Sequence, residues 1–274
     1  MVSIIAYLGP AGTFTELAAR HYDSEATLIP HSSFRLVYDS VNLNCDLAVL
    51  PIENSLNGSV VDTLDLLIHD ASLIICDEVI IKIDHHFVID QNADINNIKY
   101  IYSHPQALAQ CKVFIEANFP QANLIASLST ASAVEQIKGD SNSAAIGNLG
   151  SAELYGMKVS HMGIQDNSSN VTRFVILGKD ATDSTGFDKT SLCFTYDVDK
   201  PGQLYDTLGI FASNDINLIK IESRPSREGL GQYIFLIDFD GHQNDENIKV
   251  VMEKLRKQTN DIRVFGSYPK FNKG

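Results

Sequence analysis

One stretch of the chain reads Asn167-Ser168-Ser169-Asn170-Val171-Thr172-Arg173-Phe174-Val175-Ile176-Leu177, and it passes from a polar run directly into an apolar run. A continuous apolar run bounded by polar residues is typical of a buried strand. Thr172 and Arg173 place a hydroxyl and a guanidinium side by side at the start of that strand. The core of a strand does not need this pair, whereas an anionic substrate that loses a hydroxyl group would. The stretch therefore predicts a strand with a binding site at its start.

Upstream of this stretch, an apolar run, a polar turn and a helical pattern follow one another repeatedly. The apolar runs are 4–8, 47–50, 99–102, 124–128 and 144–146. Strands that alternate with helices indicate an α/β fold with largely parallel sheets. In such sheets ligands bind outside the carboxyl ends of the strands, where helix N-termini favour carboxylates. Several polar loops are therefore expected to converge on one cleft.

The long apolar run 73–89 interrupts this alternation. It is rich in Ile and Val, and we interpret it as one strand that crosses from a first lobe, 1–75 and 163–180, to a second lobe, 76–162. Residues 172–177 would then form the return crossing. Two lobes joined by two crossing strands resemble the type II periplasmic-binding-protein architecture, in which the ligand lies between the lobes. A single continuous sheet is the alternative.

Two of the polar turns have the spacing of a capping box, in which a hydroxyl at the N-cap precedes an acidic or amide side chain by three residues. Thr13 precedes Glu16 in this way, and Ser103 precedes Gln106. We therefore predict helix starts at both hydroxyl residues, with a continuous helical segment over 107–118 after the second.

The pattern changes after residue 180. Residues 181–189 are polar and are interpreted as a linker. Over 190–274 the strand and helix patterns follow the order βαββαβ, which is the ferredoxin-like split unit. The predicted organisation is therefore a two-lobed domain over 1–180, this linker, and a smaller α/β domain at the C-terminal end.

The composition excludes several classes of protein. A chain of 274 residues is long enough for two domains, and its mean hydropathy of −0.04 is that of a globular protein. The formal net charge of −13 argues against nucleic-acid binding, which usually needs a basic patch. No signal peptide and no membrane-spanning apolar run are visible, so we expect a cytoplasmic protein with no membrane partner. With this net charge, any anion site must be local.

Metal binding is not indicated. The four cysteines are widely spaced without a CxxC pair, which fits reduced cysteines in the cytosol. His85 and His86 are neighbours, and adjacent strand residues point to opposite faces of a sheet. We therefore predict no metal site.

Six short motifs occur in order along the chain. They are Gly9-Pro10-Ala11-Gly12-Thr13-Phe14-Thr15-Glu16, Pro51-Ile52-Glu53-Asn54-Ser55, Ser103-His104-Pro105-Gln106 with Gln110-Cys111, Gly147-Asn148, Thr172-Arg173-Phe174 and Glu222-Ser223-Arg224-Pro225. Over 1–180 the chain resembles the catalytic domain of prephenate dehydratases, and over the remainder it resembles an ACT regulatory domain. No chorismate mutase helix bundle is visible upstream, so the resemblance is to the monofunctional form.

The resemblance implies that the protein converts prephenate to phenylpyruvate. The ring carboxylate would leave as CO2 and the C4 hydroxyl as water, and aromatisation would drive the step, so no metal or redox cofactor is expected. Thr172 matches the family residue credited with assisting the leaving hydroxyl, here as a positioned hydrogen-bond donor. By the same resemblance, the expected catalytic residues are Thr172, Arg173, Asn54, Glu53 and Gln110. The expected substrate-binding residues are Thr13, Ser103, Thr130, Asn148 and Phe174.

Several of these residues also have a purely structural interpretation. Thr172 is a β-branched residue of the kind that favours strands, and Ser103 is a suitable N-cap. Arg173 is either a carboxylate ligand or the ion-pair partner of Glu53. Glu53 is a conceivable proton donor if burial raises its pKa, although a carboxylate beside a dianion is unfavourable. His104 is a conceivable general base, but a His before Pro at a helix start is more often a turn residue.

The ACT resemblance implies feedback control by L-phenylalanine. ACT domains pair edge to edge, so we expect a homodimer or homotetramer with the effector at the interface. The expected effector-binding residues are Pro201, Gly202, Gln203, Leu204, Glu222, Ser223, Arg224 and Pro225. The first four belong to a loop from Asp199 to Tyr205, and this chain has larger residues at Gln203 and Tyr205 than many relatives.

Two other functions are compatible with the same motifs. An enzyme that accepts arogenate, the aminated analogue of prephenate, would have the same residues. A non-catalytic cytosolic amino-acid-binding sensor would share the fold, because a fold does not determine a function. Turnover distinguishes the sensor from the enzymes.

Overall fold

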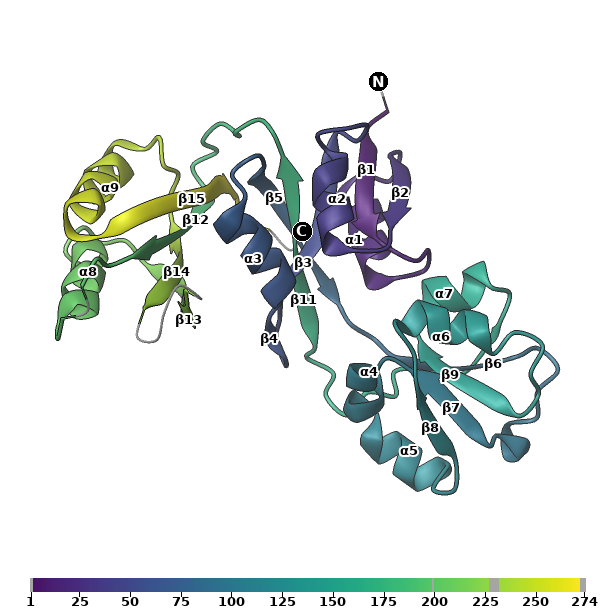
Figure 1. Cartoon of the computed structure of the whole chain (residues 1–274). Coiled ribbons are helices and arrows are strands. Elements are labelled where there is room, and N and C mark those ends of the chain that lie inside the picture. The colour runs from purple at the N-terminus through teal and green to yellow at the C-terminus, as the bar shows by residue number, and fades with distance from the viewer. Residues whose placement is uncertain (1, 199, 227–231, 272–274) are drawn as a thin grey trace. The chain divides into compact units, whose positions relative to one another are not determined.

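The computed structural model describes residues 2–198, 200–226 and 232–271 (Figure 1). The chain divides into two compact units, each made of two segments. The first unit consists of Met1–Thr63 and Val79–Phe174, and the second of Leu64–Glu78 and Val175–Gly274. Both units combine helices with strands, so the mixed α/β fold expected from the sequence is confirmed. Within the described part of the chain, no helix is long and apolar enough to cross a membrane.

The first sheet has the strand order β2-β1-β3-β11-β5, with the short strand β4 paired to β3 (Figure 1). Its strands are β1 (Ile4–Leu8), β2 (Thr27–His31), β3 (Leu47–Asn54), β4 (Gly58–Ser59), β5 (Ile74–Lys82) and β11 (Val171–Gly178). The helices of this region are α1 (Phe14–Tyr22), α2 (Phe34–Ser40) and α3 (Val61–His69). Because β1 pairs in parallel with β3, the loops that follow Leu8 and Asn54 begin at the same edge of the sheet.

The second sheet has the strand order β10-β6-β9-β7-β8. Its strands are β6 (His86–Ile89), β7 (Tyr100–Ser103), β8 (Asn123–Ala126), β9 (Ser143–Gly147) and β10 (Lys158–His161). The helices of this region are η1 (Ile95–Asn97), α4 (Pro105–Gln110), α5 (Lys112–Asn118), α6 (Thr130–Gln136) and α7 (Leu149–Leu154). Phe87 of β6 lies in a buried core with residues of α4 and α5, and its neighbour Val88 lies in another core with residues of α6. Helices therefore cover both faces of this sheet, as the alternation of side chains along β6 requires.

The chain crosses from the first sheet to the second over fewer residues than the apolar run 73–89 suggested. Residues 73–89 form two strands rather than the single expected strand, because the chain leaves the first sheet at Lys82 and enters the second at His86. Between the two strands, the N–H of Ile83 donates to the carbonyl oxygen of Asn170 over 2.9 Å. The outgoing segment is thus bonded to the residue directly before the returning strand β11.

Two further expectations, largely parallel sheets and a helix over 107–118, are met only in part. β1, β2 and β3 are parallel, as are β7, β8 and β9, but β6 pairs antiparallel with β9 and β10. β6 enters its sheet from the crossing segment and not through a helix, so no βαβ connection sets its direction. The helix expected over 107–118 is broken at Cys111, whose φ of −116° and ψ of 22° are not helical, and this residue separates α4 from α5.

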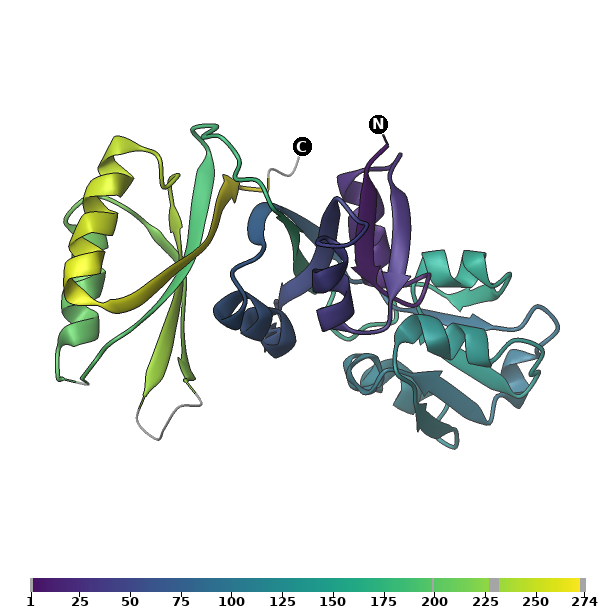
Figure 2. The same ribbon diagram turned by 45° about the horizontal axis from the view of Figure 1, so that its top comes forward.

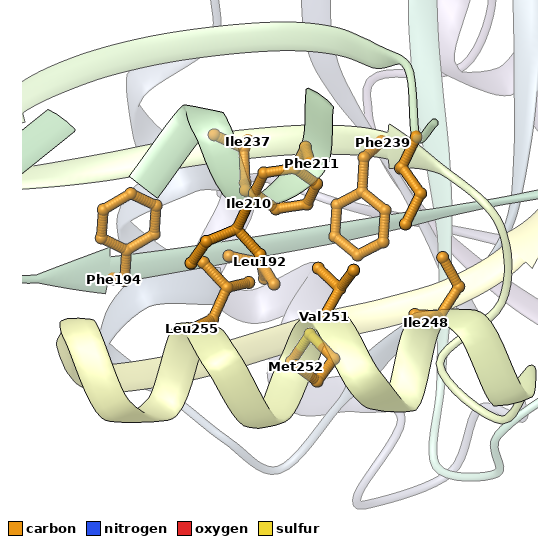
Figure 3. Packing of buried hydrophobic residues seen from close by; sticks show 11 residues of the cluster. Leu192, Phe194, Ile210, Phe211, Ile237, Phe239, Ile248, Val251, Met252 and Leu255 are labelled. Carbon is orange, nitrogen blue, oxygen red and sulfur yellow. The ribbon is translucent and has the colours of Figure 1, made fainter. Parts of the chain in front are cut away.

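The third sheet has the strand order β13-β14-β12-β15, and its pairs are antiparallel. The elements follow one another as β12 (Asp188–Thr195), α8 (Gln203–Ala212), β13 (Leu218–Pro225), β14 (Tyr233–Asp240), α9 (Glu246–Gln258) and β15 (Asn260–Pro269). Both helices cover the same face of the sheet (Figure 2). Phe211 of α8 and Val251 of α9 lie in one buried core with Leu192 and Phe239 of the strands (Figure 3).

Candidate active site

Asn54, the last residue of β3, forms hydrogen bonds with residues 170–172 at the start of β11. Its side-chain nitrogen Nδ2 donates to Asn170 Oδ1 over 2.7 Å and to Thr172 Oγ1 over 2.9 Å. The same nitrogen lies 3.2 Å from the carbonyl oxygen of Val171. An amide nitrogen has two hydrogens, so one of them is shared between two of these acceptors.

The orientation of the Asn54 amide follows from the backbone beside it. Asn54 Oδ1 accepts hydrogen bonds from the backbone N–H groups of Leu56 and Asn57, each over 3.1 Å. A backbone N–H can only donate, so the amide oxygen must face this loop. The amide nitrogen must therefore face residues 170–172.

Thr172 acts as an acceptor in this cluster. Its Oγ1 receives a hydrogen from Asn54, and among the described residues no acceptor for its own hydroxyl hydrogen is found. The Thr172 side chain is also buried. Because a threonine hydroxyl has one hydrogen and two lone pairs, the hydrogen of Thr172 is available to a ligand.

The cluster continues to a second amide and a histidine. Asn170 Nδ2 donates to Gln110 Oε1 over 3.0 Å, and the same oxygen lies 3.0 Å from His85 Nε2. Sequence reasoning identified Gln110 but missed Asn170 and His85. Asn170 could have been found, because it stands in the polar run directly before the buried strand. His85 had no such signal, because nothing in the local sequence relates it to residue 110.

Arg173 and Glu53 form an ion pair, with Arg173 Nη1 3.7 Å from Glu53 Oε2. The arginine side chain is 10% exposed and the glutamate side chain 34% exposed. This contact supports the structural interpretation of both residues. A carboxylate-binding role for Arg173 and a proton-donating role for Glu53 remain predictions.

Ser103 is not the N-cap of α4, so the capping box expected with Gln106 is wrong. Ser103 ends β7, and its buried hydroxyl donates to the carbonyl oxygen of Ile146 in β9 over 2.7 Å. The strand continues to Ser103 because this hydroxyl finds its acceptor across the sheet. The N-cap is His104, whose Nδ1 accepts from the N–H of Gln106 over 3.3 Å. Burial also lowers the pKa of His104, and both facts favour the turn interpretation over a general base.

Thr13 is the N-cap of α1, as expected. Its Oγ1 accepts from the N–H of Glu16 over 3.4 Å and donates to the carbonyl oxygen of Leu8 over 3.0 Å. The reciprocal bond differs from a capping box, because Glu16 Oε2 accepts from the N–H of Gly12 over 2.6 Å. The hydroxyl hydrogen of Thr13 is thus donated to the end of β1, and substrate binding by this residue remains a prediction.

Asn148 connects the loop after β1 to the helix after β9. It is the N-cap of α7, and its Oδ1 accepts from the N–H of Ser151 over 2.7 Å. Its Nδ2 donates to the carbonyl oxygen of Gly12 over 2.8 Å. The side chain therefore joins segments of the first and second sheets, while its contact with a substrate remains a prediction.

The remaining expectations for this unit concern Thr130, Phe174 and metal binding. Thr130 is the first residue of α6, next to the N-cap Ser129. Phe174 is buried in β11, two residues after Thr172 and thus on the same face of the strand. Substrate binding by Thr130 and Phe174 remains a prediction. In the part of the chain that the structure describes, no group of three or more His, Cys, Asp and Glu side chains could hold a metal ion.

The residues expected to bind an effector lie in two segments of the second unit. Gly202 is the N-cap of α8 with a φ of +88°, a left-handed conformation that glycine adopts readily, and Pro201, Gln203 and Leu204 flank it. The other segment ends β13 and consists of Glu222, Ser223, Arg224 and Pro225. Asp199, the first residue of the expected loop, lies outside the described residues. Effector binding by these segments remains a prediction.

These features define an α/β protein with a buried polar cluster. The part of the chain that holds the cluster is followed by a domain with two helices on one antiparallel sheet. The family model for prephenate dehydratase matches residues 5–182, and the model for the ACT domain matches residues 197–257. The chain belongs to the prephenate dehydratase family.

Named proteins that are similar to this chain support the same conclusion. A bifunctional chorismate mutase/prephenate dehydratase of Pseudomonas aeruginosa is 40% identical over 97% of this chain and 73% of its own length. A prephenate dehydratase of Methanocaldococcus jannaschii is 36% identical over 99% of this chain and 100% of its own length. The crystal structure of prephenate dehydratase from Arthrobacter aurescens in complex with L-Phe has a TM-score of 0.90 and 34% identity, covering 97% of this chain and 90% of that chain.

The function predicted from the sequence is thereby confirmed. The protein is an enzyme that converts prephenate to phenylpyruvate, and its ACT domain fits feedback regulation by L-phenylalanine. Because bifunctional relatives match as well as monofunctional ones, the monofunctional form remains a prediction.

Proposed function

We propose that Asn54, Asn170 and Thr172 form the site at which prephenate loses its C4 hydroxyl, and that the Thr172 hydroxyl donates a hydrogen bond to this leaving group. The observation behind the proposal is the 2.9 Å bond from Asn54 Nδ2 to Thr172 Oγ1. Because this bond occupies a lone pair of the threonine oxygen, the hydroxyl hydrogen is left for the substrate.

The chemistry sets what Thr172 must do. The bond between the ring and its carboxylate breaks, CO2 leaves, and the electron pair enters the ring. The bond between C4 and oxygen breaks, and the oxygen leaves as water with one proton from solvent. A threonine hydroxyl is a weak acid, so Thr172 stabilises the departing oxygen through a hydrogen bond rather than by giving up its proton. We expect a contribution of roughly 10²-fold to the rate, the lower end of general acid–base assistance.

The neighbouring residues hold the anionic substrate and the donor in place. Arg173 follows Thr172 directly in β11 and brings a buried positive charge to the site, which we assign to a substrate carboxylate. Glu53 positions this guanidinium through their ion pair. Gln110 is joined to the cluster through Asn170.

The other predicted substrate residues are assigned to the walls of the site. Ser103 and Asn148 donate to backbone carbonyl groups, so we assign them to shaping the site: Ser103 joins β7 to β9, and Asn148 joins the start of α7 to the loop after β1. Thr13, Thr130 and Phe174 are assigned to substrate contact, Thr13 and Thr130 because they stand at the starts of α1 and α6.

We also infer the finer architecture. The chain passes between its first two sheets twice, at 83–85 and before β11, which supports two lobes of the type II periplasmic-binding-protein kind. The bounds expected from the sequence, 1–75 with 163–180 and 76–162, cut through β5, whose residues 76–82 belong to the first sheet. The order of β12 to β15 supports a ferredoxin-like ACT domain over 190–274 after a linker at 181–189, although the last two residues of that range already belong to β12. We further propose a monofunctional, cytoplasmic homodimer or homotetramer that binds L-phenylalanine between ACT edges, through 201–204 and 222–225.

The experiment that tests the active site is conversion of prephenate to phenylpyruvate by wild type, Thr172→Ala and Thr172→Ser, each with and without L-phenylalanine. We expect Thr172→Ala to lose about 10²-fold in turnover and Thr172→Ser, which keeps the hydroxyl, to retain most of it. Near-normal turnover by a folded Thr172→Ala enzyme would remove Thr172 from the mechanism.

The same assay separates the alternative functions. Preferred turnover of arogenate over prephenate would identify the aminated substrate. A folded wild-type chain that binds L-phenylalanine but forms no product from either compound would favour the amino-acid-binding sensor.

A further inference from the structure

His85 lies in the short segment between β5 and β6 and is only 3% exposed. Its ring packs edge-on against Phe14 of α1, with the ring centroids 5.9 Å apart. Its Nε2 lies 3.0 Å from Gln110 Oε1. The imidazole therefore belongs to the cluster around Asn54, although it comes from a different segment of the chain.

The direction of every hydrogen bond in this cluster follows from the loop after β3. The Asn54 amide is oriented by two backbone N–H groups, so its Nδ2 donates to Asn170 Oδ1. Asn170 Nδ2 must then face Gln110, and it donates to Gln110 Oε1. A carbonyl oxygen can only accept. The contact between His85 and this oxygen therefore requires a hydrogen on His85 Nε2.

The second ring nitrogen of His85 differs from the first. Its Nδ1 is buried and has no hydrogen-bond partner among the residues that the structure describes. An unpaired buried nitrogen is unfavourable for stability, so packing alone does not explain a histidine here. Burial lowers the pKa of His85, which keeps the ring neutral with Nδ1 free of hydrogen.

We propose that His85 is a positioning residue of the active site: its Nε2–H fixes the Gln110 amide and, through Asn170 and Asn54, holds the Thr172 hydroxyl in the orientation that donates to the substrate. The proposal rests on the proposed function of Thr172. Without His85, Gln110 can turn its amide nitrogen toward the ring position and oppose Asn170 Nδ2 with a second donor. The bonds that orient Asn170 and Thr172 then weaken together.

Steady-state kinetics on prephenate test the proposal with two substitutions. We expect His85→Leu to lower kcat by about 10-fold to 100-fold with little change in KM, because the loss lies in the orientation of the donor. His85→Gln, whose side-chain N–H₂ reaches about as far as Nε2, should recover most of the loss. His86→Leu is the matched control, because His86 is also buried but its Nδ1 accepts from the N–H of Gly163 outside the cluster.

A double-mutant cycle with Gln110→Leu shows whether His85 acts through Gln110. The two losses should not add, so that His85→Leu has little effect in the Gln110→Leu enzyme. Additive losses, an unchanged kcat in folded His85→Leu, or no recovery in His85→Gln would each overturn the proposal.

A readout that does not depend on turnover keeps this proposal separate from that for Thr172. ¹⁵N NMR of histidine-labelled wild type, with His85→Gln to assign the signal, should show Nε2 protonated and Nδ1 unprotonated near neutral pH. The opposite tautomer or a doubly protonated ring would overturn the proposal even in an active enzyme. An inactive wild type with the expected tautomer would instead overturn the function proposed for Thr172, and with it the role assigned to His85.

Discussion

Lys189 Nζ lies 2.7 Å from Glu78 Oε2, and the two side chains are only 7% and 2% exposed. Lys189 belongs to β12 and Glu78 to β5, so the pair joins two residues that are far apart in the sequence but lie in one compact unit. Glu78 Oε1 also accepts from the backbone N–H of Phe271 over 2.9 Å. The pair helps to explain why residues 64–78 form one unit with the C-terminal residues.

Removing the lysine of this pair should destabilise the protein strongly. Lys189→Met removes the buried ammonium group that lies against the Glu78 carboxylate, so we expect the free energy of unfolding to fall by about 3–5 kcal/mol. Urea denaturation measures this loss. Lys82→Met is the matched control, since the side chains of Lys82 and Asp84 are 58% and 34% exposed and their pair should contribute at most about 1 kcal/mol. Equal losses in the two variants would contradict the assignment.

Replacing the hydrogen-bond donor of Asn54 by an acceptor should slow the reaction strongly. Asn54→Asp replaces the donor by a carboxylate that faces Asn170 Oδ1 and Thr172 Oγ1, both of which are acceptors in the wild type. We expect turnover to fall by about 10²-fold or more, the range of a lost catalytic group. Asn123→Asp makes the same chemical change at an exposed position of β8 and should leave turnover unchanged. A similar kcat in both variants would speak against the cluster.

The two hydrogen bonds of Asn148 can be separated by substitution. Serine is a good N-cap but lacks a donor that reaches Gly12, so Asn148→Ser keeps the cap of α7 and loses the bond to the loop after β1. Asn148→Ala loses both, and we expect it to be less stable than Asn148→Ser by about 1 kcal/mol. Both variants should raise KM for prephenate by about 5-fold, the equivalent of one hydrogen bond. An unchanged KM would exclude a role of this bond in shaping the site.

Burial of His85 makes the stability of the protein depend on pH. Burial lowers the pKa of His85 in the folded state, so below about pH 6.5 the unfolded chain binds more protons than the folded chain. The free energy of unfolding therefore decreases as the pH falls through this range. We measure the free energy of unfolding by urea denaturation and subtract the value for His85→Gln from the value for wild type. We expect this difference to decrease as the pH falls. A difference that stays constant would show that His85 does not contribute.

The ion pair of Arg224 places a predicted effector residue beside α3. Arg224 Nη2 lies 2.9 Å from Asp65 Oδ1, and α3 begins shortly after Asn54 in the chain. We expect Asp65→Asn to change the L-phenylalanine concentration for half-inhibition by about 5-fold or more, which is the low end of allosteric coupling. Turnover without L-phenylalanine should stay close to that of wild type.

The control for this prediction is Asp62→Asn, which removes the same charge from an exposed position of the same helix. It should leave the response to L-phenylalanine unchanged. Identical inhibition curves for Asp65→Asn and wild type would show that Arg224 does not transmit the effect through Asp65.

The two predicted helix starts show how far local sequence can be trusted. The N-cap at Thr13 could be predicted, because it depends on a hydroxyl and the N–H three residues later. The N-cap at His104 could not, because it depends on whether the hydroxyl of Ser103 finds an acceptor elsewhere. That acceptor is the carbonyl oxygen of Ile146, which is 43 residues away.

The sequence alone was sufficient for the alternation of strands and helices, for the family, and for the position of Thr172 at the start of a buried strand. These properties depend on periodicity and on short motifs, which are visible along the chain. Only the tertiary structure established that Asn54 donates to Thr172, 118 residues away, and that His85 belongs to the same cluster. A hydrogen bond needs its donor and acceptor within about 3 Å, and between distant residues that distance is set by strand pairing and by the crossing of the chain from one sheet to the other.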